Sequence, residues 1–349
     1  MQLKFHKVLL KKRFPLAISR GVRGDSYNLF LSYEKEGFTG WGEAAPGKNE
    51  KATTVEEMQE QLNAFLEEGI ESSTTEQLNQ RAKEMGVAPC AYAAFDIALW
   101  DWKAKKDQLP LHELLQLPRP SIPTSLTLGI IPPEQVKERI RLLLENNSAK
   151  ALKIKLGSPE GVEADQQMFA QVLESTQKYQ LKIRVDANGG WSTQDAIYMM
   201  QWLADRGVDY IEQPLEEGQE SELQYLYPNR PLPIYIDESC RYAEDVGKWA
   251  NHIDGVNMKL MKCGGITEAL QIIKNAKKQG LKTMIGCMSE SSVSIAAAAA
   301  LSGGIDHIDL DSHYNLAPDP ASGAQLIDGI TLPDFVPGHG GLLKPEYHA

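Results

Sequence analysis

Short apolar runs rich in β-branched residues recur from Pro123 onward, and each is followed by a longer stretch with helical spacing. The runs are PTSLTLGI, KALKIKLG, KIRVDANG, DYIEQP, PIYIDES, GVNMKL, KTMIGCM and HIDLDS. Strands that alternate with helix-sized segments are typical of βαβ units and of a parallel sheet, rather than of a sandwich. Eight such units predict an α/β fold, a modified (β/α)8 barrel of the TIM type, over residues 119–315.

The chain before this region has a different pattern of apolar and polar positions. Residues 2–45 alternate apolar and polar positions, as half-buried strands do, and two helical segments follow. The second segment has apolar residues at helical spacing, namely Phe95, Ala98, Leu99 and Trp102. We therefore expect a separate α+β capping domain over residues 1–118. The last segment, 316–349, is rich in Pro and Gly, and we expect it to return to that domain.

Composition excludes several classes of function. With 42% hydrophobic and 24% charged residues among 349, and no apolar run near the ~20 residues of a membrane span, we expect a cytoplasmic protein without a membrane partner. A net charge of -11 argues against nucleic acid as a partner. The four cysteines are far apart and form no CxxC pair, so we expect reduced thiols. The chemistry is therefore expected from lysines and carboxylates.

Three successive predicted strands each end in a carboxylate. These are Asp186 in RVDAN, Glu212 in YIEQP and Asp237 in YIDES, 26 and 25 residues apart. Active sites lie at this end of such barrels, and neighbouring strands are about 5 Å apart, so the three acids should converge and require a cation to stay ionised. Oxygen ligands without His or Cys favour Mg²⁺. The alternative, that each acid only caps the next helix, fits one such residue better than three in register.

Lysines flank these acids along the chain. Lys153 and Lys155 in ALKIKLG point to one face of the second strand, and Lys259 in NMKL lies on the sixth. A barrel places Lys155 and Lys259 across its mouth from each other. An ammonium near another cation and a metal has a lowered pKa, which makes a neutral lysine available as a base. Surface lysines on an edge strand are a weaker alternative because a barrel has no edge.

The eighth predicted strand carries a DxD motif. Asp309 and Asp311 lie on one face of this strand by the period of two. A DxD alone is a weak signal. At the mouth of a barrel, however, two carboxylates are suited to hold an ammonium group of a substrate.

This arrangement resembles the enolase superfamily, specifically its muconate-lactonising subgroup, and the likeness extends to AAFDIALWD and GWGE in the first domain. The DxD followed by such a tail is similar to the dipeptide epimerases. The resemblance implies an isomerase that inverts the α-carbon of the C-terminal residue of a dipeptide through an enediolate. The implied roles are Mg²⁺ binding by Asp186, Glu212 and Asp237, acid/base catalysis by Lys155 and Lys259, assistance at the substrate carboxylate by Lys153, and ammonium binding by Asp309 and Asp311.

The substrate is harder to choose. The segment AISRGVRGDS stands where a loop closes over substrate in this family, so Arg20 and Arg23 are candidates to meet it, Arg20 being the closer match. A guanidinium binds a carboxylate through two parallel hydrogen bonds, which favours L-Ala-D/L-Glu, with a hydrophobic or cationic second residue as the next choice. The alternative, that both arginines are merely solvated, is about as well supported. Thr127 and Ser289 are further candidates for binding substrate.

Other functions stay open at this point. A muconate cycloisomerase or an o-succinylbenzoate synthase would share the metal and the lysines but has no ammonium to hold. A barrel that is retained as a binding or structural protein without catalysis would be expected to have lost some of the metal ligands. A homo-oligomer is also open. The glycine pair in KCGGITEAL is interpreted as a plain turn, with Thr267 capping the next helix, rather than as a phosphate cradle.

Overall fold

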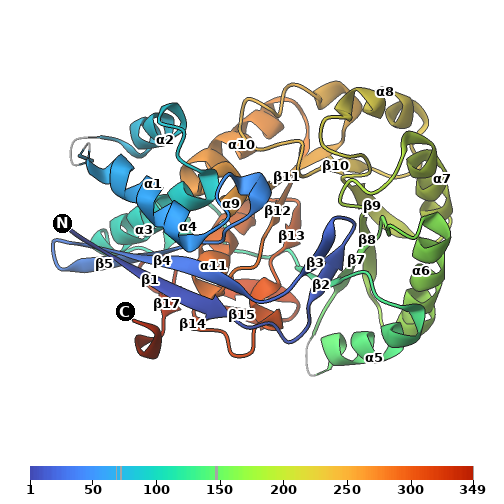
Figure 1. Ribbon diagram of the computed structural model, residues 1–349, viewed down its shortest axis with the longest axis horizontal. Coiled ribbons are helices and arrows are strands. Elements are labelled where there is room, and N and C mark those ends of the chain that lie inside the picture. The colour runs from blue at the N-terminus through green and yellow to red at the C-terminus, as the bar shows by residue number, and fades with distance from the viewer. Residues whose placement is uncertain (68, 71–72, 146–147, 349) are drawn as a thin grey trace.

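The capping domain is built on a three-stranded antiparallel sheet. The computed structural model of the protein describes residues 1–67, 69–70, 73–145 and 148–348 (Figure 1). The sheet has the order β1-β4-β5, and a small hairpin, β2-β3, extends from it. The bounds of these strands are β1 Gln2–Leu10, β2 Leu16–Ile18, β3 Gly21–Arg23, β4 Ser26–Lys35 and β5 Phe38–Ala44.

Separate helices follow this sheet, where the sequence predicts two helical segments. Their bounds are η1 Lys48–Glu50, α1 Val55–Glu67, α2 Thr75–Glu84, α3 Pro89–Lys106 and α4 Leu111–Leu114. A capping box begins α2: the hydroxyl of Thr74 accepts from the backbone NH of Gln77, and the side chain of Gln77 accepts from the NH of Thr74. Because this capping box begins a new helix, α2 is separate from α1.

Helix α3 packs closely on strand β5. Glycines at positions 40 and 42 allow this contact, because a Cβ atom would lie 2.0 Å from the carbonyl oxygen of Ala98 or 1.9 Å from that of Ala94. Any larger residue would push the helix away from the sheet. Both glycines of the GWGE segment noted in the sequence are therefore required for packing, and the segment also contains a buried acid, Glu43.

The predicted parallel barrel is confirmed. Eight strands form one sheet in chain order, and a parallel bridge between Thr124 and Ile308 joins its two ends. Each of the eight apolar runs coincides with one of these strands, although β9 begins one residue before its run. Their bounds are β6 Ser125–Leu128, β7 Ala151–Lys155, β8 Lys182–Asp186, β9 Val208–Glu212, β10 Ile234–Ile236, β11 Gly255–Lys259, β12 Lys282–Gly286 and β13 His307–Asp309.

The helices around the barrel are uneven in length. Helices α5 to α7 cover one side, whereas β9 is followed by a four-residue helix and β10 by a single 3₁₀ turn (Figure 1). The bounds are α5 Pro133–Leu144, α6 Val162–Thr176, α7 Thr193–Ala204, η2 Glu220–Glu222, α8 Leu223–Leu226, η3 Tyr227–Asn229, η4 Ala250–His252, α9 Leu260–Cys263, α10 Ile266–Lys278, α11 Ser292–Leu301, η5 Ser302–Gly304 and η6 Ser312–Asn315. No helix within the described ranges is both long and apolar enough to cross a membrane.

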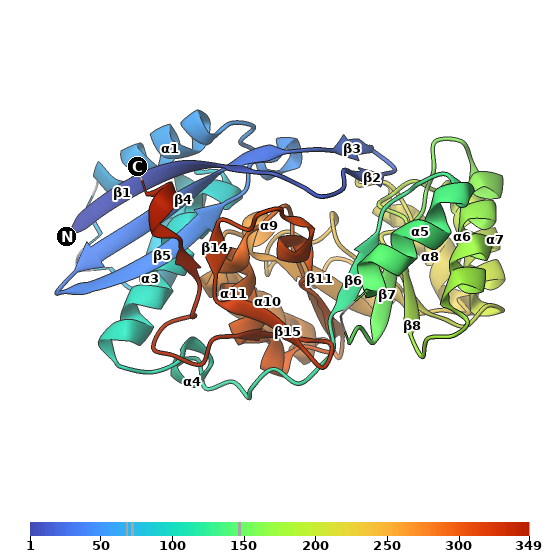
Figure 2. The ribbon, with the colours of Figure 1, turned by 90° about the horizontal axis from the view of Figure 1, so that it is seen from below.

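The C-terminal segment packs against the capping sheet. Leu316, Ala321 and Leu343 form one buried cluster with Val8 and Phe30 of β1 and β4. Figure 2 shows the C-terminus beside β1. The elements of this segment are β14 Ala321–Ser322, β15 Ala324–Ile327, β16 Ile330–Pro333, β17 Leu342–Leu343 and η7 Pro345–Tyr347.

The glycine pair before α10 forms a turn, but Thr267 does not cap that helix. The N-cap position is Gly265, which has no side chain to offer. Instead, Asp96 of α3 accepts from the backbone NH of Thr267 at 3.0 Å and from its hydroxyl at 2.5 Å. The expectation of a local cap was wrong because a carboxylate from the capping domain takes this place and ties the two domains together.

Candidate active site

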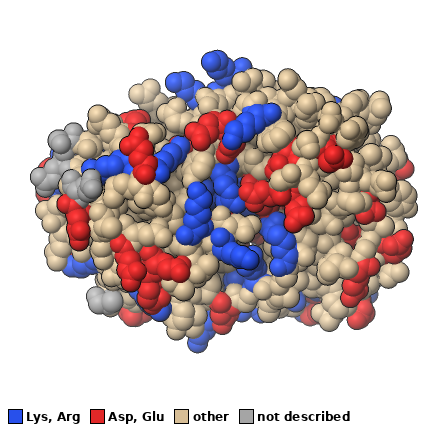
Figure 3. All heavy atoms as spheres, turned by 45° about the horizontal axis from the view of Figure 1, so that its top comes forward, with Lys and Arg blue, Asp and Glu red and all other residues tan. Residues whose placement is uncertain are grey.

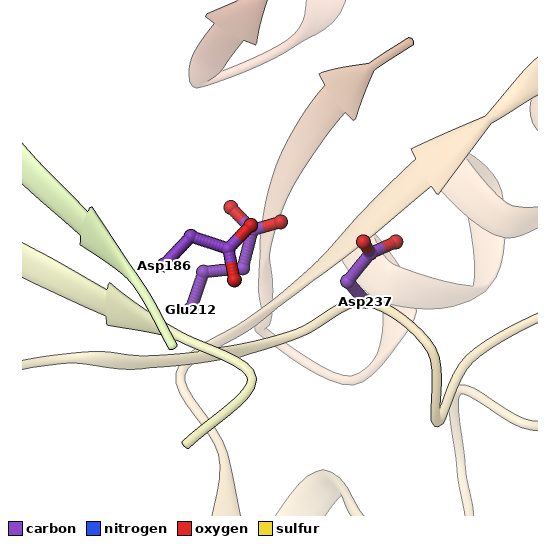
Figure 4. Close-up of side chains that lie close together, drawn as sticks. All are labelled: Asp186, Glu212 and Asp237. Carbon is purple, nitrogen blue, oxygen red and sulfur yellow. The ribbon is translucent and has the colours of Figure 1, made fainter. Parts of the chain in front are cut away.

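Three carboxylates from neighbouring strands meet at the carboxyl end of the barrel. Asp186 ends β8, Glu212 ends β9, and Asp237 directly follows β10. One oxygen atom from each lies within 4.8 Å of the others, and all three side chains are buried. Figure 4 shows Asp186 and Glu212 side by side at the ends of their strands, with Asp237 on the next segment. The acids selected from the sequence therefore lie together.

Positive charge is unevenly distributed around this cluster. Burial would raise the pKa of Asp186, but the ammonium groups of Lys155 and Lys153 outweigh burial and lower it to about 2. Burial, with the neighbouring Asp186, raises the pKa of Glu212 to about 8. The nearby lysines therefore do not supply enough positive charge to keep all three carboxyl groups ionised at neutral pH, although Lys153 lies 2.7 Å from Glu212. A divalent cation between the three acids would supply that charge, so the donors and their electrostatics fit Mg²⁺.

Lys153 is the most enclosed cation of the site. Its side chain is fully buried, and its Nζ lies 2.7 Å from Glu212, 2.6 Å from Asp309 and 3.4 Å from Asp186. Burial would lower the pKa of this ammonium, but the three carboxylates outweigh burial and raise it well above its ordinary value. Lys153 is therefore a fixed positive charge at the centre of the acids.

Lys155 and Lys259 contact different members of the acid cluster. Lys155 ends β7 and donates to Asp186 at 2.6 Å, whereas Lys259 ends β11 and donates to Asp237 at 2.7 Å. Burial would lower the pKa of Lys259, but Asp237 outweighs burial and raises it. The lowered pKa expected for a lysine beside a bound metal stays a prediction, since the carboxylate in direct contact raises the pKa of Lys259 here.

A further buried lysine, Lys262, was missed by the sequence analysis. It lies in α9 and donates to the carboxylate of Asp237 at 2.6 Å, to the carbonyl oxygen of Asp237, and to that of Asn257 at 2.8 Å. Burial would raise the pKa of Asp237, but Lys259 and Lys262 outweigh burial and hold it well below its ordinary value. The signal in the sequence was a second lysine three positions after Lys259, within the otherwise apolar KLMKC.

The two acids of the DxD motif differ in their surroundings, and only Asp309 lies on the eighth strand, because β13 ends there and Asp311 precedes η6. Asp309 accepts from Lys153 through Oδ2, and its buried Oδ1 has no hydrogen-bond partner within the described part of the chain. Asp311 accepts from the backbone NH of Thr127 at 2.6 Å. Burial, with Asp309 next to it, raises the pKa of Asp311 to about 7. Thr127, a candidate for contact with substrate, thus contacts Asp311.

These groups face a large cavity of about 1590 Å³ between the barrel and the capping domain. Its lining includes Lys155, Lys259, Asp309 and Asp311 as well as the remaining substrate-binding candidates, Arg20, Arg23, Thr127 and Ser289. In the space-filling view of Figure 3, Lys and Arg side chains gather near the middle of the face, with acidic side chains beside them. The cavity is larger than a dipeptide requires, so its chemistry rather than its volume must select the substrate.

The arginines near the mouth are not equivalent. Arg20, in the turn of the β2-β3 hairpin, donates to Glu238 at 2.5 Å and to the carbonyl oxygen of Asn188 at 2.8 Å. Arg23 lies on β3 with its side chain exposed. Ser289 accepts from the side chain of Asn28 through its carbonyl oxygen at 2.8 Å. Glu238 was missed because it follows Asp237 in YIDES without any pattern of its own.

The family models, the sequence relatives and the solved structures that this chain resembles agree with one another. Residues 1–116 match the mandelate racemase / muconate lactonizing enzyme N-terminal domain, and residues 135–347 match the enolase C-terminal domain-like family. A hydrophobic dipeptide epimerase of Flavobacteria bacterium strain MS024-2A is 65% identical over 100% of both chains, and one of Roseobacter litoralis is 56% identical over 99% of both. The solved dipeptide epimerase of Enterococcus faecalis, complexed with Mg and L-Leu-L-Tyr, superimposes with a TM-score of 0.88 at 31% identity, covering 97% of this chain and 98% of that one.

Proposed function

The chain belongs to the mandelate racemase / muconate lactonizing enzyme family of the enolase superfamily, and we propose that it is a dipeptide epimerase that inverts the C-terminal residue of its substrate. One observation carries this proposal. Two lysines, Lys155 and Lys259, contact opposite members of one acid cluster from strands that lie on either side of it. Inversion at a carbon requires a base on one face and an acid on the other, and this pair supplies both.

The acid cluster addresses the difficulty of the reaction. The α-proton of a carboxylate is a weak acid because its removal places a second negative charge on the same group. Asp186, Glu212 and Asp237 would hold Mg²⁺, which would supply a Lewis acid that stabilises this charge. Lys153, held among the same acids, adds a fixed positive charge next to it.

The two lysines would then move the protons. One, as the neutral amine, accepts the α-proton of the substrate at Nζ. The other, as an ammonium, donates a proton from its own side, so that the α-carbon is left with the opposite configuration. The unpartnered Oδ1 of Asp309, with Asp311 beside it, would accept hydrogen bonds from the α-ammonium group of the dipeptide.

For the second residue of the substrate we propose a hydrophobic side chain. From the sequence, L-Ala-D/L-Glu is the first choice of substrate, and a dipeptide with a hydrophobic or cationic second residue is the next choice. Two observations favour the second choice. The relatives at 65% and 56% identity are named for hydrophobic dipeptides, and the guanidinium of Arg20 is already paired with Glu238.

Steady-state kinetics on a small panel tests this proposal. We expect kcat/KM with Mg²⁺ to be at least about tenfold higher for L-Ala-L-Leu than for L-Ala-L-Glu or L-Ala-L-Lys. A tenfold difference corresponds to a modest free-energy cost of placing one charged side chain where a hydrophobic one fits. A preference for Glu or Lys would contradict the hydrophobic substrate while leaving the epimerase intact. Failure to epimerise any dipeptide of the panel would contradict the function itself.

A further inference from the structure

The β2-β3 hairpin lies against the barrel end through a few polar contacts. Figures 1 and 2 both show it beside strand β7, far from the rest of the capping sheet. The hydroxyl of Ser19 donates to the carbonyl oxygen of Asn188 at 2.8 Å, and the NH of Ile130 donates to that of Ala17 at 2.8 Å. Residues of the hairpin on both sides of Arg20 line the active-site cavity, so its position decides how closed that cavity is.

Arg20 makes the strongest of these contacts. Its Nη2 donates to Oε1 of Glu238 at 2.5 Å, and its Nη1 donates to the carbonyl oxygen of Asn188 at 2.8 Å. Glu238 is only 6% exposed and adjoins Asp237 in the chain. Asn188 connects the same carboxylate to the acid cluster, because its Nδ2 lies 3.4 Å from Glu238 and 3.2 Å from Asp186. The pair therefore joins the hairpin directly to the rim of the site.

This pairing changes what a substrate would meet. An unpaired guanidinium at the mouth would attract a carboxylate side chain. Here the guanidinium already faces a buried carboxylate, so an acidic side chain would encounter Glu238 as well as Arg20. The second oxygen of Glu238 is buried without a hydrogen-bond partner among the described residues, which leaves its negative charge only partly compensated. Repulsion of this kind discriminates against a competing ligand as effectively as attraction selects the preferred one.

We infer that Arg20 is a latch that closes the hairpin over the site, and that Glu238, by holding Arg20, sets the specificity against dipeptides with an acidic second residue. This inference rests on the proposed epimerase function. Arg20 is a positioning residue in this account and does not bind the substrate side chain. Glu238 determines specificity because it pairs with the positive charge that Arg20 would otherwise present to the substrate at the mouth of the cavity.

The first test is the ratio of kcat/KM for L-Ala-L-Glu to that for L-Ala-L-Leu, which cancels any general loss of activity. In Glu238→Gln, which keeps the shape but removes the negative charge that faces the guanidinium, we expect this ratio to rise at least about tenfold. In Arg20→Ala, kcat/KM should fall for both dipeptides, and the ratio should not rise, because Glu238 keeps its charge and loses the guanidinium that faces it. Arg206→Ala, which removes an exposed arginine outside the cavity lining, is the matched control and should behave like wild type.

The second test follows the hairpin itself and needs no turnover. Amide hydrogen exchange of residues 16–25 should be at least about fivefold faster in Arg20→Ala and in Glu238→Gln than in wild type, and unchanged in Arg206→Ala. Arg20→Lys, which retains a charge, should restore part of the protection. This measurement stands even if no dipeptide is epimerised, so it separates failure of the latch from failure of the proposed function.

Several results would overturn the inference. A collapse of L-Ala-L-Glu turnover in Arg20→Ala that persists when Glu238→Gln is added would mean that Arg20 binds a substrate carboxylate. An unchanged ratio in Glu238→Gln would remove Glu238 as the determinant of specificity. Unaltered exchange of the hairpin in Arg20→Ala would show that it is not a latch, whether or not the Glu238 variant folds.

Discussion

The ammonium nitrogen of Lys259 lies 2.7 Å from a carboxylate oxygen of Asp237, so a candidate base and a candidate metal ligand are in direct contact. Lys262 contacts the other oxygen of the same carboxylate at 2.6 Å. These two cations keep Asp237 ionised although it is buried. The contact also means that a cation bound by the acids would compete with Lys259 for Asp237, which would help to release Lys259 as a base.

Activity should depend on a divalent metal ion bound by the three acids. Asp237→Asn keeps the shape of the side chain but removes a charged ligand, so we expect kcat to fall by more than the 10- to 100-fold that is usual for an outer-shell partner, roughly 1,000-fold. The measurement is turnover with Mg²⁺ and after treatment with excess chelator. Full activity of the chelated protein would be incompatible with the metal site.

Lys262 should support the site without touching substrate. Lys262→Met keeps a long side chain but removes the charge that fixes Asp237, so we expect Mg²⁺ affinity to fall by about 10- to 100-fold, as for other partners of metal ligands. Calorimetric titration with Mg²⁺ measures this directly. Lys248→Met, which removes an exposed lysine paired with Asp245, is the control. Equal affinities in the two variants would exclude the role of Lys262.

The two lysines should be separable by the configuration of the substrate. Lys155→Ala and Lys259→Ala should each reduce epimerisation by at least about 100-fold, since each removes one proton-transfer group. Each variant should still exchange the α-proton with D₂O in only one of the two epimers, because the remaining lysine reaches one face. The assay is ¹H NMR of both epimers separately. Wild-type epimerisation by either variant would refute the two-base assignment.

Stability should decrease as pH rises from about 4.5 to about 8 because of Glu290. Burial, together with Glu43 nearby, raises the pKa of Glu290 to about 8 in the folded state. The folded protein therefore retains this proton up to about pH 8, whereas the unfolded chain loses it near its ordinary value of 4.5. The resulting stability is fully present below the lower value and is lost as pH rises through the upper one.

Glu290→Gln removes this titration while keeping a group of the same shape. Between pH 5 and pH 8.5 we expect the free energy of unfolding of the variant to gain on the order of 3 kcal/mol relative to wild type. Urea unfolding of both proteins at the two pH values measures the difference, in which other titrating groups largely cancel. A difference that does not change with pH would contradict the assignment.

The residues found from the sequence share one property: regular structure fixes their position. Because side chains alternate along a strand, Lys153 and Lys155 had to share a face, and because barrel strands end at a common rim, Asp186 and Glu212 had to meet there. No long-range information was needed. The period of the strands and the order of the barrel place these residues before any contact is known.

The contacts that sequence analysis missed include pairs between distant segments. Arg20 and Glu238 are 218 positions apart, and they meet only because the hairpin lies over the barrel. Asp96 and Thr267 are 171 positions apart, and their pairing replaces a local helix cap. Neither segment carries a pattern that indicates the other. Such pairs follow from the packing of one domain on the other, which the sequence of either segment alone does not specify.

The most direct test of the account is the fate of the α-proton when the purified protein and Mg²⁺ act on L-Ala-L-Leu in D₂O. The account predicts that L-Ala-D-Leu accumulates until the two epimers coexist, with deuterium at the α-carbon of the leucine and none at that of the alanine, as followed by ¹H NMR and chiral chromatography. A dipeptide recovered with its configuration and all its α-protons intact, or deuterium incorporated at the alanine, would contradict it.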